Sequence, residues 1–152
     1  MAAEKVYVQY WREDNTVQPP RYTRNGDACM DVCAWKIENL YKQGIVIVHT
    51  GLHFAVPAGY EMQIRLRSGA TKFRYVMINA PGTLDSNYRG ELLLKLTKID
   101  GGYSDDFPFR AGDRCMQINL HKIPDIVLFE EQTLQDLGET NRGDGGFGSS
   151  GR

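Results

Sequence analysis

Apolar and polar residues alternate with a period of two along much of the chain, and this is the pattern of a half-buried β-strand. Apolar side chains occupy every second position between residues 60 and 66, between 92 and 96 and between 116 and 120. Most of the positions between them are charged or carry an amide. The alternation therefore predicts three strands, each with one face toward a core and one more polar face.

Other segments have the β-branched and aromatic composition of strands. They span residues 6–10, 45–49, 52–56, 75–78 and 126–130. Turn-forming sequences such as Pro57-Ala58-Gly59 and Pro81-Gly82 separate the segments. The pattern allows only short helices, within residues 68–74 or 133–137. Many short strands at close spacing predict an all-β protein, a sandwich or a barrel.

Glycine is concentrated at the C-terminal end of the chain. Of the 16 glycines among 152 residues, six lie between Gly138 and Gly151. A chain of this length is one domain by the usual prior of about 100–200 residues. We therefore expect a β-rich core over residues 1–137 and a mobile arm over 138–152. Composition leaves two interpretations of the arm open: a disordered end, or a loop whose backbone N–H groups bind an anion.

Charge and targeting signals narrow the class of protein. The chain has 18 Lys and Arg against 19 Asp and Glu, which argues against a general nucleic-acid or membrane-surface binder. It has no run of 18 apolar residues and no apolar segment near its N-terminus, so we expect neither a transmembrane helix nor a signal peptide. Its three cysteines fit structural thiols in a reducing compartment. We expect a cytoplasmic protein, with a nuclear location left open.

Five polar clusters that contain glycine interrupt the predicted strands. They span residues 26–32, 67–69, 79–90, 112–117 and 142–151. Arg67 beside Ser68 and Gly69 suits an oxyanion, and the two acids of the first cluster could face a hydrated divalent cation. Each cluster alone can equally be an ordinary loop, and in the fourth Asp113 and Arg114 could form a structural ion pair.

Two histidines raise the question of a metal site. His49 and His53 are four residues apart, a spacing that brings two imidazoles together only on a helix. Because the run of isoleucine and valine at residues 45–48 is typical of a strand, we expect ordinary strand or turn histidines.

Taken in order, the five clusters resemble the five motifs of the trimeric all-β dUTPase family, the dUTP pyrophosphatases. The segments that carry the resemblance are Ala28-Cys29-Met30-Asp31-Val32, Arg67-Ser68-Gly69, Gly82-Thr83-Leu84-Asp85-Ser86-Asn87-Tyr88-Arg89-Gly90, Gly112-Asp113-Arg114-Cys115-Met116-Gln117 and Arg142 to Gly151. Departures are mild: Leu66 stands where the family often has proline, and Ser150 stands where threonine is usual.

The resemblance implies a distorted jelly roll or β-barrel, and an enzyme that hydrolyses dUTP to dUMP and pyrophosphate. Such an enzyme keeps uracil out of DNA and supplies dUMP for dTMP synthesis. Water would attack the α-phosphorus, with Asp85 as the general base. Mg²⁺ is the implied cofactor, and Asp31 would bind it through water rather than directly.

The resemblance also assigns contacts to the substrate. Asn79 and the backbone near Leu93 would read the uracil edge. Tyr88 would exclude a 2′-hydroxyl, and Phe147 would stack over the base. The phosphate chain would lie against Arg67, Ser68, Gly69, Gln117 and Arg142. The remaining implied substrate contacts are Gly82, Leu84, Gly148 and Ser149.

By the same resemblance the enzyme is a homotrimer whose active sites are shared between subunits, with the arm arriving from a neighbour. We expect no stable nucleic-acid partner and no membrane partner. Two alternatives stay open: an enzyme like the dCTP deaminases of the same superfamily, which attack the base, and a regulatory or binding protein on the dUTPase scaffold. The loop at residues 100–110 has no assigned role and is where a second binding function would be sought.

Overall fold

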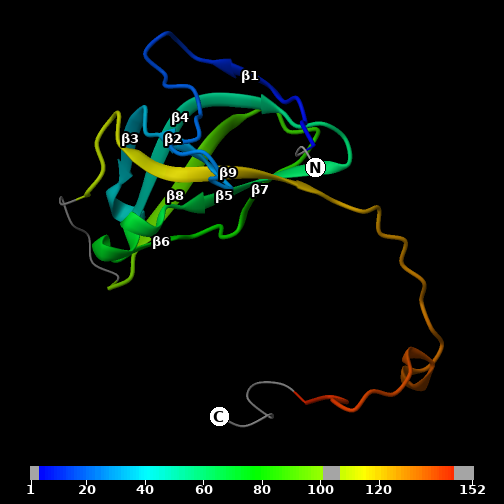
Figure 1. Cartoon of the computed structure of the whole chain (residues 1–152). Coiled ribbons are helices and arrows are strands. Elements are labelled where there is room, and N and C mark those ends of the chain that lie inside the picture. Colours follow the sequence, from blue (N-terminus) through cyan, green and yellow to red (C-terminus); the bar gives the residue numbers. More distant parts are fainter. Residues whose placement is uncertain (1–3, 101–106, 146–152) are drawn as a thin grey trace.

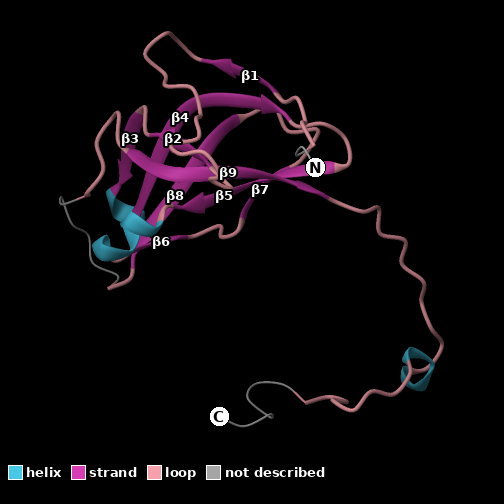
Figure 2. Cartoon of the chain, in the orientation of Figure 1, coloured by secondary structure: helices cyan, strands magenta, loops and turns pink. Residues whose placement is uncertain are grey.

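The computed structural model describes residues 4–100 and 107–145, and over these residues the protein has an all-β fold (Figures 1 and 2). Nine strands form two antiparallel sheets. In chain order the strands are β1 (Gln9–Arg12), β2 (Met30–Cys33), β3 (Lys36–Leu40), β4 (Ile45–Ala55), β5 (Tyr60–Leu66), β6 (Tyr75–Met77), β7 (Gly82–Leu84), β8 (Glu91–Lys98) and β9 (Arg114–Lys122). The described residues contain no α-helix, so the predicted all-β class is confirmed.

One hydrophobic core joins the two sheets. The first sheet has the strand order β1-β4-β8-β6, with β3 also paired to β4, and the second has the order β2-β9-β5-β7. Leu92, Leu94 and Leu96 of β8 are fully buried and belong to one cluster with Ile64 of β5 and Ile118 of β9. Burying an aliphatic side chain of this size contributes about 1.5–3 kcal/mol. The three strands predicted from alternation are confirmed, and their apolar faces form this core.

The longest strand, β4, joins two segments that the sequence pattern separates. Residues 45–49 and 52–56 are predicted as two strands, whereas β4 is continuous. Gly51 lets it continue, because its φ is +63° and a Cβ there would lie 2.5 Å from a valine methyl group. Glycine adopts this φ without strain. It does so where the register between β4 and β8 shifts, between His49 and His53.

Three short strands, β2, β3 and β7, have no counterpart in the sequence pattern. Each is five residues or fewer, too short for a clear alternation. They are strands because they pair with β9, β4 and β5 respectively, and such tertiary pairing overrides weak local propensity. The predicted strand at residues 6–10 is observed slightly later, as β1 at 9–12.

The predicted strand at residues 126–130 is wrong. The segment pairs with no strand of the described chain. The four apolar side chains from Ile126 to Phe129 are 79–89% exposed, and the chain after β9 runs away from the sheets (Figure 1). A strand needs a neighbour for its backbone N–H and C=O groups. This segment has strand composition without such a neighbour.

Both predicted short helices are present as 3₁₀ helices, η2 (Ser68–Phe73) and η3 (Leu134–Leu137), and a third, η1 (Tyr41–Gln43), precedes β4. The start of η3 is capped, since the Thr133 amide donates to the Asp136 carboxylate at 3.0 Å. Within residues 4–100 and 107–145, no helix is long and apolar enough to cross a membrane.

Candidate active site

A pocket of about 280 Å³ lies between β7, at the edge of one sheet, and β8 of the other. We call it the hairpin pocket, because the loop 85–90 that joins these strands contributes to its lining. The residues that line it are Ile64, Asn79, Thr83, Leu84, Asp85, Tyr88, Glu91, Leu93 and Lys95. The structure therefore brings together five predicted site residues: Asn79, Leu84, Asp85, Tyr88 and Leu93.

Hydrogen bonds hold the loop 85–90 in a tight turn. The Tyr88 amide donates to the Asp85 carbonyl at 3.1 Å. The Arg89 guanidinium donates to the carbonyls of Ser86 and Tyr88 at 2.8 and 2.6 Å. The Tyr88 hydroxyl donates to the carbonyl of Glu91 at 3.1 Å. The tyrosine ring is thus fixed against the start of β8.

Two glycines make room for this arrangement. A Cβ at Gly90 would overlap the ring and hydroxyl of Tyr88. A Cβ at Gly82 would lie 2.5 Å from Met77 Cε and 3.2 Å from Ile64 Cβ. Gly82, predicted as a substrate contact, is itself buried, so close packing under the pocket is enough to explain it.

The lining of the hairpin pocket combines an apolar wall with a few polar groups. Asp85 is exposed to solvent, and an ionised carboxylate can accept a proton from a water molecule beside it. Asn79 is exposed too and offers both a donor and an acceptor. Leu93 and Ile64 supply apolar surface. This combination can hold a polar ring and orient a water molecule.

A second group of predicted residues surrounds Asp31, and we call Asp31, Arg67 and Arg114 the arginine cluster. Asp31 Oδ1 lies 2.7 Å from Arg67 Nε, and Oδ2 lies 3.2 Å from Arg114 Nη1. The Thr23 hydroxyl also donates to Oδ2, at 2.6 Å. Asp31 is buried, while the two arginine side chains are 32% and 38% exposed. Two cations around one anion leave a net positive charge at the surface, which suits a phosphate.

The order β2-β9-β5 puts the other predicted phosphate contacts beside the arginine cluster. Gln117 of β9 lies directly opposite Asp31 of β2. Arg67 follows the last residue of β5, and Ser68 and Gly69 open η2 with both residues exposed. The structure therefore gathers four of the five predicted phosphate contacts, leaving Arg142 aside.

The sequence resemblance assigns Asp31 to Mg²⁺, which prefers oxygen ligands. Both of its carboxylate oxygens already contact a guanidinium group, so a direct bond to the metal would displace one of these contacts. Among the described residues, no three His, Cys, Asp or Glu side chains form a group that could hold a metal ion. These two ion pairs disfavour a direct bond from Asp31 to the metal, and the contact through water stays a prediction.

Asp85 and Arg67 lie toward opposite ends of β5, although Ile64, further along the strand, also lines the hairpin pocket. Met62, near the start of β5, pairs with Leu84, which precedes Asp85. Arg67 follows the end of the same strand. Since a strand rises about 3.4 Å per residue, Met62 and Arg67 are about 17 Å apart. One chain therefore divides the predicted site into two groups.

The predicted contacts of the arm form a third group. Arg142 lies on the segment that runs away from the sheets (Figure 1), and its Nε donates to the Gly145 carbonyl at 2.7 Å. Phe147, Gly148 and Ser149 lie outside the described residues.

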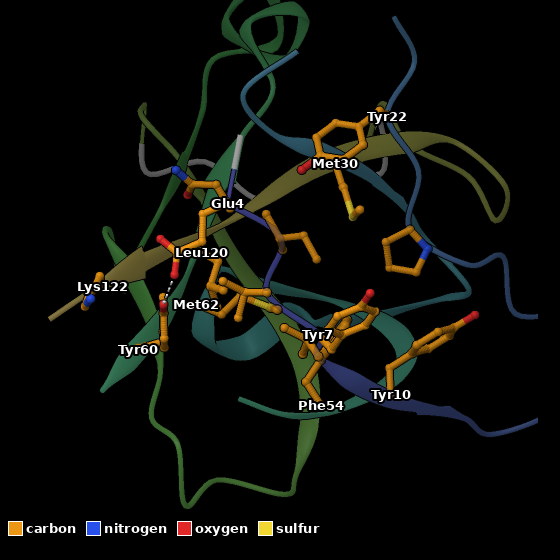
Figure 3. A pocket seen from close by; sticks show the side chains of 15 residues that line it. Glu4, Tyr7, Tyr10, Tyr22, Met30, Phe54, Tyr60, Met62, Leu120 and Lys122 are labelled. Atoms are coloured by element: carbon orange, nitrogen blue, oxygen red, sulfur yellow. Dashed lines mark hydrogen bonds between the residues drawn. The ribbon is translucent and has the colours of Figure 1, made fainter. Parts of the chain in front are cut away.

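A larger pocket, of about 590 Å³, lies between the N-terminal segment, β5 and β9 (Figure 3). Tyrosines and apolar side chains dominate its lining, and Tyr60 donates to Glu4 across it at 3.5 Å. No predicted site residue lines it. The chemistry therefore favours the smaller hairpin pocket as the candidate site.

The cysteines near the arginine cluster are poor nucleophiles. Burial raises the pKa of Cys115 to about 12. Burial also raises the pKa of Cys33, and it outweighs the opposite effect of nearby arginines. Because the thiolate is the reactive form, both positions fit the structural thiols that we expect from the sequence.

Several residues at these two groups were not among the predicted contacts. Glu91 and Lys95 line the hairpin pocket, but alternation with leucines marks them only as the polar face of a strand. The proposed pair of Asp113 and Arg114 is wrong: Arg114 contacts Asp31, and Asp113 instead accepts from the Arg110 amide at 2.7 Å. Strand pairing between β2 and β9, which sequence spacing does not reveal, creates the observed contact.

Comparisons with known proteins show the fold and the family of the chain. The deoxyuridine 5′-triphosphate nucleotidohydrolase of Fusobacterium nucleatum is 38% identical over 152 residues, which cover 98% of this chain and 99% of that protein. A dUTPase of Staphylococcus bacteriophage 80alpha, solved with dUpNHpp, shares the fold with a TM-score of 0.78 at 20% identity, covering 97% of this chain and 100% of that one.

A mutant dUTPase from phage phi11 of S. aureus, whose structure is described as revealing the coordination of a structural Mg(II) ion, has a TM-score of 0.65 at 17% identity. The match covers 86% of this chain and 99% of that one. A family model described as dUTPase matches residues 15–151. With that match and the Fusobacterium relative, the chain belongs to the dUTPase family.

Proposed function

We propose that this protein hydrolyses dUTP to dUMP and pyrophosphate, by attack of water on the α-phosphorus. The observation that supports it most is the hairpin pocket, where the exposed carboxylate of Asp85 lies with Asn79 and Tyr88 around one cavity. Asp85 orients the water and takes its proton. A general base of this kind typically contributes a rate factor of about 10²–10⁴.

The base and the sugar bind in the hairpin pocket. The amide of Asn79 and the backbone near Leu93 pair with the uracil edge, and cytosine presents the reversed donor and acceptor pattern. A buried polar group left unpaired costs about 1–3 kcal/mol. Tyr88 lies under the deoxyribose, with its ring fixed by the hydroxyl bond to Glu91, and so excludes a 2′-hydroxyl.

The triphosphate binds to the arginine cluster and to the residues beside it. Arg67 and the loop at Ser68 and Gly69 donate to phosphate oxygens, as does Gln117. Mg²⁺ neutralises charge on the phosphate chain. Asp31 holds Arg67 and Arg114 in place and contacts the metal only through water, which is consistent with its two ion pairs.

The active site is shared between the subunits of a homotrimer. Arg67 lies about 17 Å along β5 from the position opposite Leu84, which precedes Asp85. This separation supports the proposal, because Asp85 from one chain and an arginine cluster from another can face a single nucleotide. The exposed apolar run from Ile126 to Phe129 supports it too, since contiguous exposed apolar side chains mark protein contacts. We further propose that the arm, residues 138–152, closes over the nucleotide of a neighbouring chain.

Product analysis tests the reaction. We expect pyrophosphate release from dUTP, and far less from dCTP, dTTP or UTP. Ammonia released from dCTP would favour a deaminase instead. Tight binding of dUTP with no product would favour a regulatory protein built on the dUTPase scaffold.

Mixed trimers test the shared site. Chains with Asp85→Asn and chains with Arg67→Ala are each expected to be inactive alone. When they are unfolded together and refolded as mixtures, some sites combine an intact hairpin pocket with an intact arginine cluster, and activity returns. Mixtures that stay inactive while sedimentation shows mixed trimers would contradict a site built from two chains.

Truncation tests the arm. A chain that ends at Asn141 is expected to keep the β-core, by its far-UV spectrum and its melting temperature, and to lose turnover. It loses Arg142 and the glycine-rich segment but no residue of β1–β9. Full activity of the truncated chain would remove the arm from the site.

A further inference from the structure

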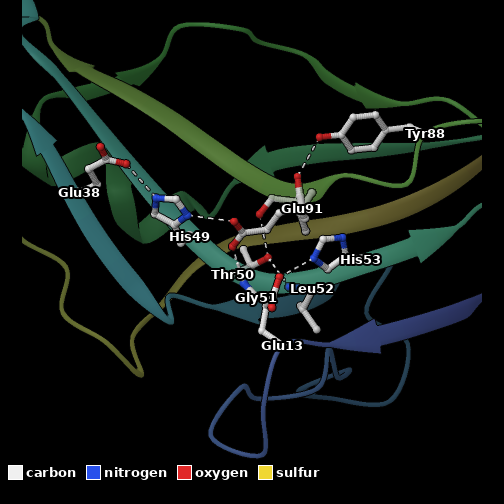
Figure 4. A network of polar contacts seen from close by, with 10 residues as sticks. Glu13, Glu38, His49, Thr50, Gly51, Leu52, His53, Tyr88 and Glu91 are labelled. Carbon is white, nitrogen blue, oxygen red and sulfur yellow. Dashed lines mark hydrogen bonds and ion pairs between the residues drawn. The ribbon is translucent and has the colours of Figure 1, made fainter.

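Two histidines of β4 lie beside the start of β8, at the point where β4 and β8 change register (Figure 4). His49 and His53 lie on either side of Gly51. In the β4–β8 ladder, His53 is directly opposite Glu91, the residue that follows the loop 85–90. The reaction as proposed above uses neither histidine.

Each imidazole lies between two hydrogen-bond acceptors. His49 Nδ1 is 2.9 Å from Glu91 Oε2, and its Nε2 is 3.1 Å from Glu38 Oε2. His53 Nδ1 is 2.9 Å from the Arg89 carbonyl oxygen, and its Nε2 is 2.9 Å from Glu13 Oε1. A carbonyl or a carboxylate accepts and does not donate, and a neutral imidazole has only one N–H. Both contacts of each ring are satisfied together only when the ring is an imidazolium ion.

The groups that these two rings hold belong to the hairpin pocket. His53 holds the carbonyl of Arg89. Glu91, which lines the pocket, takes a bond from His49 through one carboxylate oxygen and from the Gly51 amide, at 2.7 Å, through the other. The main-chain carbonyl of Glu91 in turn fixes the Tyr88 hydroxyl. Residues 88–91 are therefore anchored to β4 through the two histidines.

The charged groups around the histidines are mainly acidic. Glu38 of β3 and Glu91 of β8 face His49, and Glu13, in the segment after β1, faces His53. On the remaining side of His53 lies the Trp11 ring, 5.3 Å away between centroids. Lys36 pairs with His49 across the β3–β4 ladder, but its ammonium group sits over the Trp35 ring.

This setting favours the charged form of both rings. Burial lowers the pKa of His49, but the bonds to Glu91 and Glu38 outweigh it, and the net pKa is raised above 6.5. Burial likewise lowers the pKa of His53. The hydrogen bonds to the Arg89 carbonyl and to Glu13 outweigh burial, so the net pKa of His53 is raised. The paired hydrogen bonds of each imidazolium ring are therefore complete below pH 6.5. They are lost as the pH rises through the raised pKa values of His49 and His53.

We propose that His49 and His53, as imidazolium ions, are positioning residues that hold residues 88–91 in the geometry that binds nucleotide. The inference rests on the proposed function of the hairpin pocket. It predicts that substrate binding weakens as the histidines lose their protons, while the chemical step at Asp85 does not depend on them.

The variant Glu13→Gln is the sharpest test. It removes one carboxylate that faces His53 and leaves every residue of the hairpin pocket unchanged. NMR titration of the intact protein follows the imidazole signals and the backbone amides of residues 88–91. We expect these amides to titrate together with the His53 ring, and both midpoints to move to lower pH in Glu13→Gln. The control is His121→Gln, because His121 contacts Asn119 and Arg65 instead of the loop.

Steady-state kinetics give the second readout. We expect KM for dUTP to rise about tenfold as the pH passes the His53 midpoint, since a charge-assisted hydrogen bond is lost. The rise should begin at lower pH in Glu13→Gln. It should be smaller in His53→Gln, whose KM is high throughout and in which only His49 still loses a proton. At each pH, kcat should match the control. The proposal would be overturned if the amide signals of residues 88–91 did not change as His53 titrates. It would also be overturned if KM depended on pH in the same way in the wild type and in Glu13→Gln.

The two proposals fail in different ways. If the wild type does not hydrolyse dUTP at any pH, the proposed function fails, and the amide titration still decides whether the histidines position the loop. If the wild type hydrolyses dUTP with no coupling between the histidines and residues 88–91, only the positioning role fails.

Discussion

The hairpin pocket and the arginine cluster are built around the same strand, β5, and have opposite electrostatic character. The pocket joins apolar side chains to two carboxylates, the exposed Asp85 and the half-buried Glu91, and to one ammonium group, that of Lys95. The cluster has two guanidinium groups around one buried carboxylate, Asp31, and carries a net positive charge. Loop and strand residues close in sequence form most of the pocket. In the cluster, Asp31 comes from β2, Arg114 from β9 and Arg67 from the position after the end of β5.

This difference indicates a division of labour within one substrate. A pocket that combines apolar side chains with several polar groups suits a neutral base and sugar, and a positive cluster suits a polyanion. Arg67 lies about 17 Å along β5 from the position opposite Leu84, which precedes Asp85. The shared site that we propose would account for both the contrast in charge and this separation.

The change with the largest expected effect removes the carboxylate from the pocket. Asp85→Asn keeps the size of the side chain but can no longer take a proton from water, so we expect kcat to fall by about 10²–10⁴-fold. Binding of dUTP, measured by calorimetry, should change little because the arginine cluster is intact. Asp125→Asn, on the exposed segment after β9, is the matched control. Near-normal turnover in Asp85→Asn would exclude this residue as the base.

The second change removes the carboxylate from the cluster. Asp31→Asn leaves Arg67 and Arg114 without their counter-ion. Because both arginines are partly exposed, we expect a loss of about 1.5–3 kcal/mol of unfolding free energy, the usual contribution of hydrogen bonds to a charged group. Denaturant unfolding at fixed protein concentration measures it. Asp113→Asn, which loses one exposed hydrogen bond, should cost about 1 kcal/mol or less. Equal stability of the two variants would show that Asp31 does not organise the cluster.

The contrast also explains how far the sequence predicts the fold. Strands whose side chains alternate, such as β5 and β8, are predictable because one face is buried. β2 and β7 are not, because partner strands rather than their own residues make them strands. The prediction for residues 126–130 is wrong for the opposite reason. This segment has the composition of a strand, but within the described chain it has no neighbouring strand to pair with.

The candidate site divides in the same way. Asp85 and Tyr88 can be predicted from a contiguous motif, since the loop that carries them is local in sequence. The ion pair of Arg114 with Asp31 cannot, because it joins residues 83 positions apart through the pairing of β2 with β9. Glu91 is missed for another reason: its role depends on the histidines of β4, which come close only through strand register.

A smaller effect is expected inside the pocket. Tyr88→Phe keeps the ring that faces the sugar and removes the hydroxyl bond to the Glu91 carbonyl. The loss of one partly exposed hydrogen bond should raise KM for dUTP by about fivefold with kcat unchanged, and preference for dUTP over UTP should remain. Tyr88→Ala should lose that preference as well. If Tyr88→Ala still rejects UTP as the wild type does, the ring is not the group that excludes the 2′-hydroxyl.

The smallest expected effect is that of ionic strength, which should weaken binding at the arginine cluster and hardly change binding in the hairpin pocket. Raising the ionic strength from about 0.1 to about 1 M shortens the screening length from about 10 to about 3 Å. At constant free Mg²⁺, we expect KM for dUTP to rise about threefold, because Arg67 and Arg114 are partly exposed and are screened. Inhibition by deoxyuridine, which has no phosphate and would occupy only the hairpin pocket, should be nearly independent of salt. A salt dependence shared equally by both ligands would mean that the pocket and the cluster do not divide the substrate between them.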